Sequence, residues 1–303
     1  MKKYIKTRIE HYVFNSVNLV IMMLVMFCTL YPFWNTIVVS FNNAADTTRG
    51  GITFWPRVFS LHNYNVVFTS GTIYNAFLIS LARTIIQTIT GVFFTSMLAY
   101  TLSRKNYIFR KPFTLILILS MYINAGLIPN YFLIRSLGMI NTFWVYIVPG
   151  MISAFNFIVI RTYMGNLPES IMESARIDGC GDFVIFTRIV LPLCLPVLAT
   201  IALFIAVGAW NSWFDTMIYN SGRAYLHTLQ YKLMEYLQSS QSQAKSAAAI
   251  GIMGMAQNMA SSMVTPVSIR AAVTVVAALP ILFVYPFLQR YFITGINVGS
   301  VKE

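Results

Sequence analysis

Charged residues are scarce in this chain. They make up 10% of the 303 residues, and Asp and Glu together number only nine, whereas a soluble domain carries about 25% charged residues. Hydrophobic residues account for 57%. This composition excludes an ordinary soluble domain and predicts an all-α, polytopic membrane protein, because a spanning helix needs about 20 mostly apolar residues.

Groups that carry chemistry are also few. The chain has three cysteines and three histidines, and none has the spacing of a metal site. His11, His62 and His227 lie outside the apolar segments, and we expect them to be ordinary surface residues. No G-x-x-x-x-G-K-[ST] motif occurs, so the chain cannot cradle ATP phosphates in the usual way. We therefore expect neither an enzyme nor a cofactor in this chain.

Six apolar segments are long enough to cross a membrane, and Arg83 is the one charged residue inside them. The first segment is longer than the core of a signal peptide and no cleavage site follows it, so we expect it to be retained. Residues 1–12 are predicted to form a cytoplasmic segment and 13–303 a single membrane domain. The predicted spans are 13–34, 74–102, 113–134, 142–160, 193–214 and 271–289.

Lys and Arg favour one set of connections. Thirteen of them lie in the N-terminal segment, the 103–112 loop, the 161–192 loop and the tail, against seven in the alternate loops. Positive residues stay in the cytoplasm, so both termini are predicted to be cytoplasmic. The net charge of +12 thereby has a topological explanation, and nucleic acid is not an expected partner.

The segment 74–102 carries a stripe of small and polar residues at steps of three and four, which places them on one helix face. They are Ser80, Thr84, Gln87, Gly91 and Thr95. Such a face either packs against another helix or lines a cavity. Arg83 lies beside the stripe, and it either extends to the outer surface or points into a wet cavity.

The loop 161–192 separates the fourth and fifth segments. Pro168, followed by a glutamate, favours a helix start, because proline suits the first position and a carboxylate complements the helix N-terminus. This helix can end at Gly179 or Gly181, and Asp182 can cap a second helix. The apolar side of the second helix would carry three residues, Phe183, Phe186 and Ile189.

Residues 173–196, ESARIDGCGDFVIFTRIVLPLCLP, resemble the cytoplasmic coupling loop of ATP-binding-cassette (ABC) importer permeases. The family pattern is E-A-A-x-x-D-G-A-x-x-x-x-x-F-x-x-I-x-L-P-L-x-x-P, and ten of its positions agree. The resemblance implies a coupling-helix loop between helices four and five that passes the closure of an ATPase subunit to the membrane helices. The implied coupling residues are Glu173, Ser174, Ala175, Asp178, Gly179, Phe186, Ile189, Leu191 and Pro192.

Other motifs extend the resemblance over most of the chain. Gly126–Pro129, Arg135–Gly138, Asn141-Thr142 and Gln289–Phe292 look like carbohydrate permeases of the maltose-type G-subunit group, in its LplC/YtcP-like branch. The family usually ends in glycine, whereas Glu303 stands here. The resemblance implies a permease for oligosaccharides or polysaccharide fragments in the plasma membrane of a bacterium.

The resemblance also implies partners. Two ATPase subunits would bind ATP and Mg²⁺, and a second, non-identical permease would complete the translocation path within the membrane lipid. An extracytoplasmic sugar-binding lipoprotein would deliver the oligosaccharide. The external loop 217–268 is either a linker, a short helix with Ile250, Met253 and Met255, or a contact for a partner or its cargo.

Sugars are held by aromatic faces and polar edges. Six residues near span interiors or outer ends have this chemistry, although each can instead serve packing: Tyr122, Asn124, Asn156, Trp210, Asn211 and Trp213. Import of a non-carbohydrate solute is the alternative. A passive channel would need pore-lining charge or carbonyls, and an intramembrane enzyme would need paired catalytic groups at membrane depth.

Overall fold

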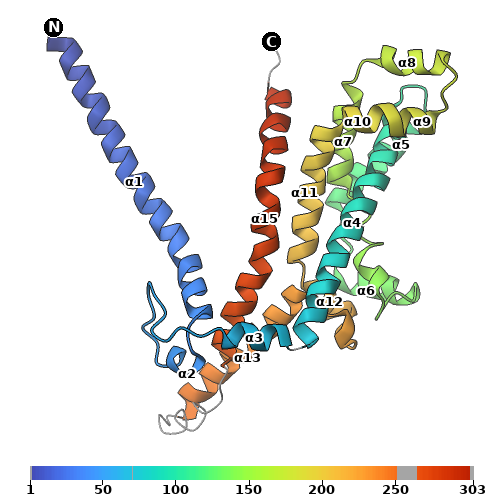
Figure 1. The fold of residues 1–303 in the computed structure, drawn as a ribbon. Helices are drawn as coiled ribbons and strands as arrows, with labels where there is room; N and C mark the ends of the chain where they lie inside the picture. Colours follow the sequence, from blue (N-terminus) through green and yellow to red (C-terminus); the bar gives the residue numbers. More distant parts are fainter. Residues whose placement is uncertain (1, 70, 251–264, 301–303) are drawn as a thin grey trace. The chain divides into compact units, whose positions relative to one another are not determined.

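The computed structural model describes residues 2–69, 71–250 and 265–300 (Figure 1). Their regular structure is helical, and one isolated antiparallel bridge pairs Asn42 with Phe59. The chain separates into two compact units. The first comprises Met1–Ser70 with Glu235–Val276, and the second comprises Gly71–Met234 with Ala277–Glu303.

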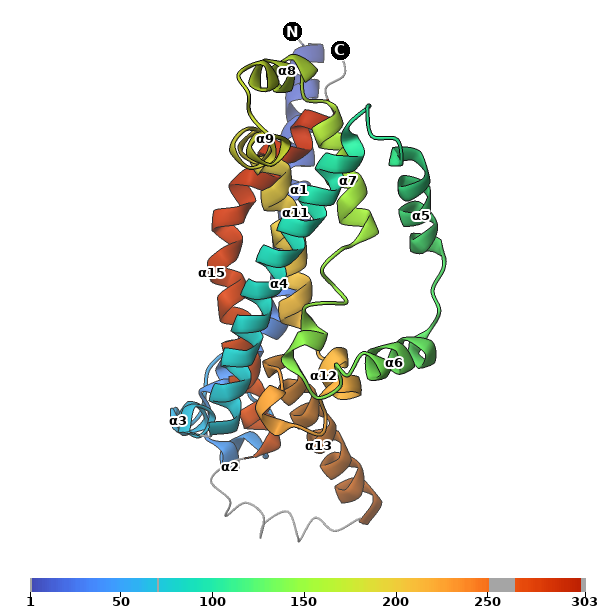
Figure 2. The same ribbon diagram turned by 90° about the vertical axis from the view of Figure 1, so that its right-hand side faces the viewer.

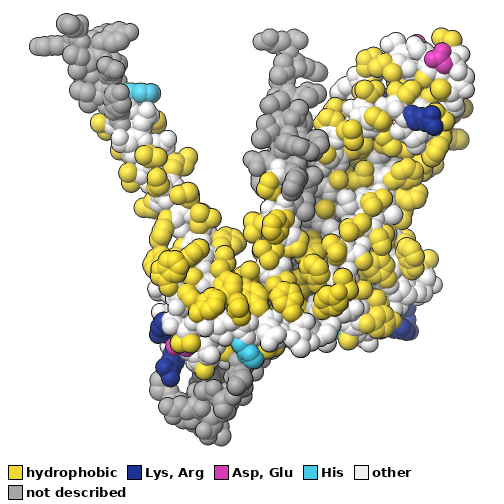
Figure 3. All heavy atoms as spheres, viewed as in Figure 1, with side chains coloured by type: hydrophobic (Ala, Val, Ile, Leu, Met, Phe, Trp, Pro, Cys, Tyr) yellow, Lys and Arg dark blue, Asp and Glu magenta, His cyan; other side chains and the backbone are white. Residues whose placement is uncertain are grey.

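The first unit holds α1 (Lys2–Ser40), α2 (Ala44–Thr47) and α3 (His62–Thr69). Helix α1 is continuous from Lys2, so residues 2–12 of the predicted cytoplasmic segment belong to the same helix as the first span. Large apolar side chains are exposed along α1, with Phe33 at 71%, and Figure 3 shows them in yellow. Such a surface is suited to lipid, because an apolar face gains nothing from water.

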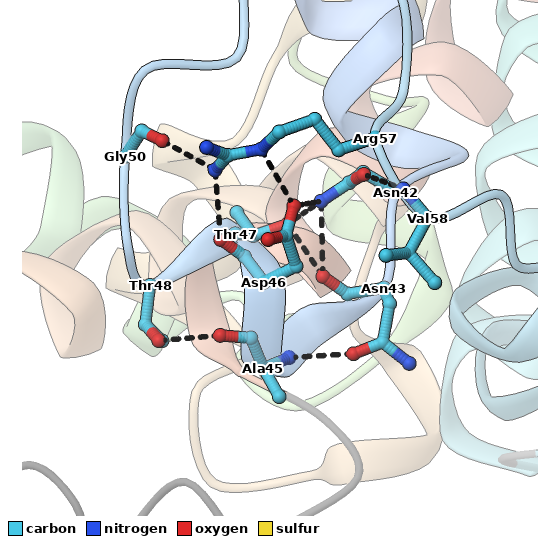
Figure 4. Close-up of polar contacts among 9 residues, drawn as sticks. All are labelled: Asn42, Asn43, Ala45, Asp46, Thr47, Thr48, Gly50, Arg57 and Val58. Carbon is cyan, nitrogen blue, oxygen red and sulfur yellow. Dashed lines mark hydrogen bonds and ion pairs between the residues drawn. The ribbon is translucent and has the colours of Figure 1, made fainter.

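A polar cluster fixes the chain after α1 (Figure 4). Asn42 is fully buried; its Nδ2 donates to Asp46 Oδ2 at 3.0 Å and its Oδ1 accepts from Val58 N at 3.0 Å. Arg57 pairs with Asp46 at 3.0 Å. The bond from Asn42 is the largest cause of the lowered pKa of Asp46. This stabilisation is therefore present at neutral pH and lost as the pH falls through that lowered pKa.

The second unit is built on α4 (Gly71–Ser103), which packs mainly against α7 (Ala154–Gly165) and α11 (Leu195–Asn211). At 1.5 Å per residue the 33 residues of α4 extend about 50 Å, which exceeds the roughly 30 Å of a bilayer core. The remaining short helices of this unit join the ends of these three. They are α5 (Arg110–Tyr122), α6 (Leu127–Ser136), η1 (Phe143–Tyr146), α8 (Glu169–Ile177), α9 (Asp182–Ile185), η2 (Phe186–Val190), α10 (Leu191–Leu193), α12 (Phe214–Tyr219) and η3 (Ala224–Leu226).

The predicted third and fourth spans are each interrupted, as the Gly126 and Pro129 of the third and the Pro149-Gly150 of the fourth favour. The segment 113–134 is divided into α5 and α6, with Gly126 at φ +85° between them. The segment 142–160 begins with η1, and α7 starts only after Ser153, whose Oγ accepts from Asn156 N at 3.5 Å. Pro149 explains this second break, because proline has no amide N–H and disfavours helix at the preceding residue.

Two helices contribute to both units. Helix α13 (Leu229–Ile250) occupies much of the predicted external loop, and α15 (Pro266–Ser300) contains the predicted span 271–289. Met253, Met255 and Glu303 lie outside the described residues. The predicted surface histidine His227 is instead 6% exposed, with its ring 4.7 Å from that of Tyr231.

Two described helical stretches, Val13–Ser40 and Gly71–Ser103, are each long and apolar enough to cross a membrane. A third span is possible where Asp182–Leu193 and Leu195–Asn211 meet at 84°. Val267–Phe283 is a shorter apolar stretch. The described helices therefore support a membrane protein but do not by themselves supply six separate spans.

The buried amide of Asn42 gives a stability prediction. Asn42→Ala leaves Val58 N–H and the Asp46 carboxylate without this partner, and it should lower the free energy of unfolding by about 1–3 kcal/mol. Thermal unfolding of the detergent-purified protein, followed by tryptophan fluorescence, measures the loss. Arg57→Ala is the control, because Arg57 is 46% exposed and exposed ion pairs contribute little. An equal effect of both changes would contradict the prediction.

Candidate functional site

Residues 168–193, named the elbow below, form the predicted coupling loop. Pro168 precedes α8, and Glu169 occupies its first turn. Helix α8 ends at Ile177, and the left-handed residue that stops it is Gly179, at φ +81°, rather than Gly181. Gly179 N–H donates to Arg176 O at 3.0 Å and Cys180 N–H to Ala175 O at 2.9 Å. This pair of bonds is a Schellman motif, which needs a left-handed residue and so favours glycine.

The second arm of the elbow starts at Asp182, with Gly181 as the preceding cap residue. Its helix continues as α9, the π-helix η2 and α10, and then turns by 84° into α11. Pro192 and Pro196 stand on either side of this turn. Neither proline can donate a helical hydrogen bond, so the sequence fixes the place of the bend.

The inner face of the elbow belongs to the core of the second unit. Ala175 is 6% exposed and Phe186 is 1% exposed. The Phe186 ring lies 5.4 Å from that of Tyr100 on α4, and Ile189 and Leu191 pack against the same core. Four of the nine predicted coupling residues therefore anchor the elbow to the helices.

The outer face carries other predicted residues. Glu173, Ser174, Asp178, Gly179 and Pro192 are exposed. Among the described residues of the elbow, two large apolar side chains are also strongly exposed, Ile177 at 87% and Phe183 at 63%.

The predicted apolar side of the second helix is divided between core and surface, because Phe186 is buried and Phe183 is exposed. Ile177 was not among the predicted coupling residues. Ile177 could have been found, because it follows Met172 by five residues and Ala175 by two, which places it on the opposite side of α8 from these buried residues. Exposed apolar patches on a folded protein commonly mark interaction sites.

Polar contacts tie the elbow to the end of α4. Lys105 Nζ lies 2.8 Å from Glu169 Oε2, and Arg176 Nη2 lies 3.1 Å from Asp182 Oδ1 between the two arms. Arg104 donates to Met172 Sδ. The hydrogen bond from Lys105 is the largest cause of the lowered pKa of Glu169. The contact is therefore complete at neutral pH and weakens only as acid protonates Glu169.

The six predicted substrate residues do not form one constellation. Tyr122, the last residue of α5, is 82% exposed. Asn124 follows it in the α5–α6 connection, where its Oδ1 accepts from Gly126 N at 2.9 Å. Asn156, in the first turn of α7, is 8% exposed. These positions belong to three different segments of the second unit.

The other three candidates lie at the end of α11. Trp210 is 4% exposed, its Nε1 donates to Ala277 O at 2.9 Å, and its ring meets Phe77 at 5.9 Å, which fits the packing alternative. Asn211 is exposed, and its Oδ1 accepts from Gln230 Nε2 at 3.2 Å. Trp213 is half-buried.

A cavity of about 560 Å³, lined by both polar and apolar side chains, lies elsewhere in the second unit. Arg83 and Gln87 of α4 line it together with Tyr146, Asp215 and Tyr219. Arg83 is 2% exposed and is paired with Asp215. Of the two expectations for Arg83, the wet cavity is therefore closer to the structure, although the partner carboxylate was missed. A signal was present, since an ionisable residue inside a span needs a partner.

Metal chemistry finds no support in the described residues, where no group of three or more His, Cys, Asp or Glu side chains could hold an ion. The elbow instead offers an exposed, partly apolar surface. The cavity offers hydrogen-bonding groups and aromatic rings. These features suit binding and the transmission of motion.

Comparison with known proteins identifies the family. The model described as "Binding-protein-dependent transport system inner membrane component" matches residues 91–298. The chain is 37% identical over 283 residues to the polygalacturonan/rhamnogalacturonan transport system permease protein YtcP of Bacillus subtilis, covering 93% of this chain and 95% of YtcP. It is 36% identical over 290 residues to Protein LplC of the same organism, covering 96% of this chain and 95% of LplC.

A solved structure agrees. The fold is similar to a bacterial ABC transporter involved in the import of the acidic polysaccharide alginate, with a TM-score of 0.80 and 26% identity, covering 93% of this chain and 97% of that chain. The resemblance carried by residues 173–196 is thus confirmed at the level of the family. The chain belongs to the binding-protein-dependent transport system inner membrane component family: it is a membrane permease subunit of an ABC transporter and is not itself an enzyme.

Proposed function

We propose that this chain is the permease of an ATP-driven importer for oligosaccharides or polysaccharide fragments. Related permeases are named for polygalacturonan and rhamnogalacturonan, for arabinooligosaccharides and for melibiose, raffinose and stachyose. The substrates in these names are all chains of sugars, although the sugars differ. The observation that carries the proposal is the elbow, whose inner face is part of the helical core and whose outer face is free.

The proposed topology has six membrane segments, with both termini and the elbow in the cytoplasm of a bacterium. In chain order, the first and second segments are α1 and α4. The third is α5 with α6, and the fourth is η1 with α7. The fifth and sixth are α11 and α15. Broken helices are compatible with membrane depth where protein or a cavity covers the freed backbone groups. The 103–112 and 161–192 loops would face the cytoplasm because their Lys and Arg residues favour that side.

The elbow is proposed to dock on a separate ATPase subunit that binds ATP and Mg²⁺. Ile177 and Phe183 would enter an apolar part of that subunit, and Glu173 and Asp178 would meet its polar rim. Packed interfaces move as units rather than deforming continuously. Closure of two ATPase subunits would therefore move α4, α7 and α11 together with the elbow.

Three further partners complete the proposal. A second, non-identical permease would line the other half of the path, and an extracytoplasmic lipoprotein would deliver the sugar. Purified complex in vesicles, supplied with that lipoprotein and ATP, should accumulate oligosaccharide against its gradient. ATP-independent accumulation, or an elbow accessible only from outside the cell, would contradict the proposal.

Ile177→Ser should weaken ATPase docking without unfolding the permease. Ile177 is 87% exposed, so the change removes little intramolecular packing, whereas truncation of a hot-spot residue at the centre of an interface costs more than about 1 kcal/mol. We expect about a tenfold weaker association of the ATPase subunit, measured by co-purification and by titration in detergent.

Two control variants separate docking from folding. Ile108→Ser changes an equally exposed isoleucine, at 88%, outside the elbow and should leave the association unchanged. Phe186→Ala changes a core ring and should cost about 3–5 kcal/mol of stability. Equal losses of association for the Ile177 and Ile108 variants would argue against docking through the elbow.

Gly179→Ala should uncouple ATP hydrolysis from uptake. A Cβ at Gly179 meets no atom within 4 Å, so only its φ of +81° opposes the change, at about 1–2 kcal/mol. The strained elbow should relax, and uptake per ATP hydrolysed should fall several-fold in proteoliposomes. Gly181→Ala is the matched control, because Gly181 also has open space but an ordinary φ of −71°. Normal coupling in the Gly179 variant would refute the prediction.

A further inference from the structure

The cavity beside Arg83 is formed entirely within the second unit. Its lining residues come from α4, α6, the α6–η1 connection, the segment 145–150 and α12, and α6 and α12 lie together away from the elbow end of α4 (Figure 2). Its volume of about 560 Å³ falls within the range of about 300–1,000 Å³ typical of ligand pockets. It is thus large enough for a small ligand.

The guanidinium of Arg83 is held on most sides. It pairs with Asp215, its Nη1 lies 3.4 Å from Ser212 O, and its Cζ lies 4.6 Å from the centre of the Tyr146 ring. Ser212 Oγ also donates to Asp215 at 2.9 Å. The arginine is therefore fixed in place before any ligand arrives, which reduces the entropic cost of binding.

Two buried polar atoms on this face of α4 lack partners. Among the described residues, Arg83 Nε and Gln87 Oε1 have no hydrogen-bond partner. Both side chains line the cavity, and a spacing of four residues puts them one above the other on the helix. A buried polar group without a partner costs about 1–3 kcal/mol, so this pair calls for a ligand group that satisfies both.

The two atoms need ligand atoms with opposite hydrogen-bonding roles. Arg83 Nε–H is a donor and Gln87 Oε1 is an acceptor, and a hydroxyl can accept from the first while donating to the second. A carboxylate can only accept, so it would leave Gln87 Oε1 unsatisfied. It would also approach Asp215, which lines the same cavity and whose side chain is 36% exposed.

The charge balance of the cavity also favours an uncharged ligand over an acidic one. Of the described residues that line the cavity, Arg83 and Asp215 are the charged ones, and they are paired with each other. No surplus cation remains there to attract an acid. The half-buried ring of Tyr219 adds aromatic surface, which suits the apolar face of a sugar.

We propose that this cavity is a subsite for an uncharged sugar ring, with one hydroxyl bound between Arg83 Nε and Gln87 Oε1. The proposal rests on the oligosaccharide-import function above and specifies which kind of ring this chain contacts. A polymer with alternating acidic and neutral residues would place a neutral residue here. Arg83 and Asp215 position the site, and Gln87 selects for a hydroxyl over a carboxylate.

Gln87→Met tests the selection. Methionine keeps the length of the side chain and removes the orphan acceptor, so the fold should be preserved while one hydrogen bond to the ligand is lost. Binding of radiolabelled galactobiose and digalacturonate to the whole transporter, without its receptor, is measured by equilibrium dialysis. These two disaccharides differ in their carboxylates. We expect the wild type to bind galactobiose at least tenfold more tightly, and the variant to lose about tenfold for galactobiose.

Two other variants complete the test. Gly150→Ala introduces a Cβ 2.5 Å from Gln87 Nε2, so it displaces the Gln87 side chain without removing a polar group, and it should also weaken galactobiose binding. Thr90→Ala is the control, because Thr90 Oγ1 bonds to Ile86 O on its own helix at 2.7 Å and is not part of the lining.

Three results would overturn the proposal: no saturable binding of galactobiose, equal or tighter binding of digalacturonate, or wild-type binding by the Gln87→Met transporter. Its failure is distinguishable from failure of the importer function. ATP-driven uptake and ATPase docking through the elbow can remain intact when galactobiose does not bind in this cavity. Loss of both would count against the importer itself.

Discussion

The apolar core shared by the elbow and the helices is the contact on which the structure of the second unit depends. Met172, Ile185 and Phe186 of the elbow are buried in the same cluster as Phe157 of α7 and Ile201 of α11. A surface loop bound only by polar contacts could tilt independently of the helices. Because protein cores pack as densely as organic crystals, this elbow cannot move without displacing them. The exposed contacts Lys105–Glu169 and Arg176–Asp182 guide its orientation rather than hold it.

The other end of α4 is held by hydrogen bonds and an ion pair rather than by apolar packing. Ser80 Oγ accepts from Leu229 N at 2.8 Å, Tyr146 Oη donates to Leu226 O at 2.8 Å, and Arg83 pairs with Asp215. Inside a membrane each such group must find a protein partner or pay a large desolvation cost. These bonds therefore gather α4, η1 and the segments after α11 around the cavity. One helix, α4, thus contacts the elbow at one end and the cavity with Arg83 and Asp215 nearer the other.

The stripe of small and polar residues on α4 shows that the two expectations for it were not exclusive. Gly91 approaches Ile205 of α11 so closely that an added Cβ would lie 3.1 Å from it, and Thr95 bonds to Met151 O at 3.3 Å. These positions pack. Gln87, one turn nearer Arg83, lines the cavity instead. The same periodicity serves both purposes, since a helix face runs past different neighbours along its length.

The sequence by itself determined the class of this protein. Scarce charge, long apolar segments and the motif at 173–196 were enough to predict a helical ABC permease, because composition and local spacing act residue by residue. Gly179 and the prolines around α10 likewise fixed the elbow's bends through backbone geometry alone. Tertiary structure decided what depends on residues far apart in the chain: the exposure of Phe183 beside the buried Phe186, and the burial of His227. It also brought Asp215 to Arg83 across 132 positions, because burial and pairing depend on three-dimensional neighbours that spacing along one helix does not specify.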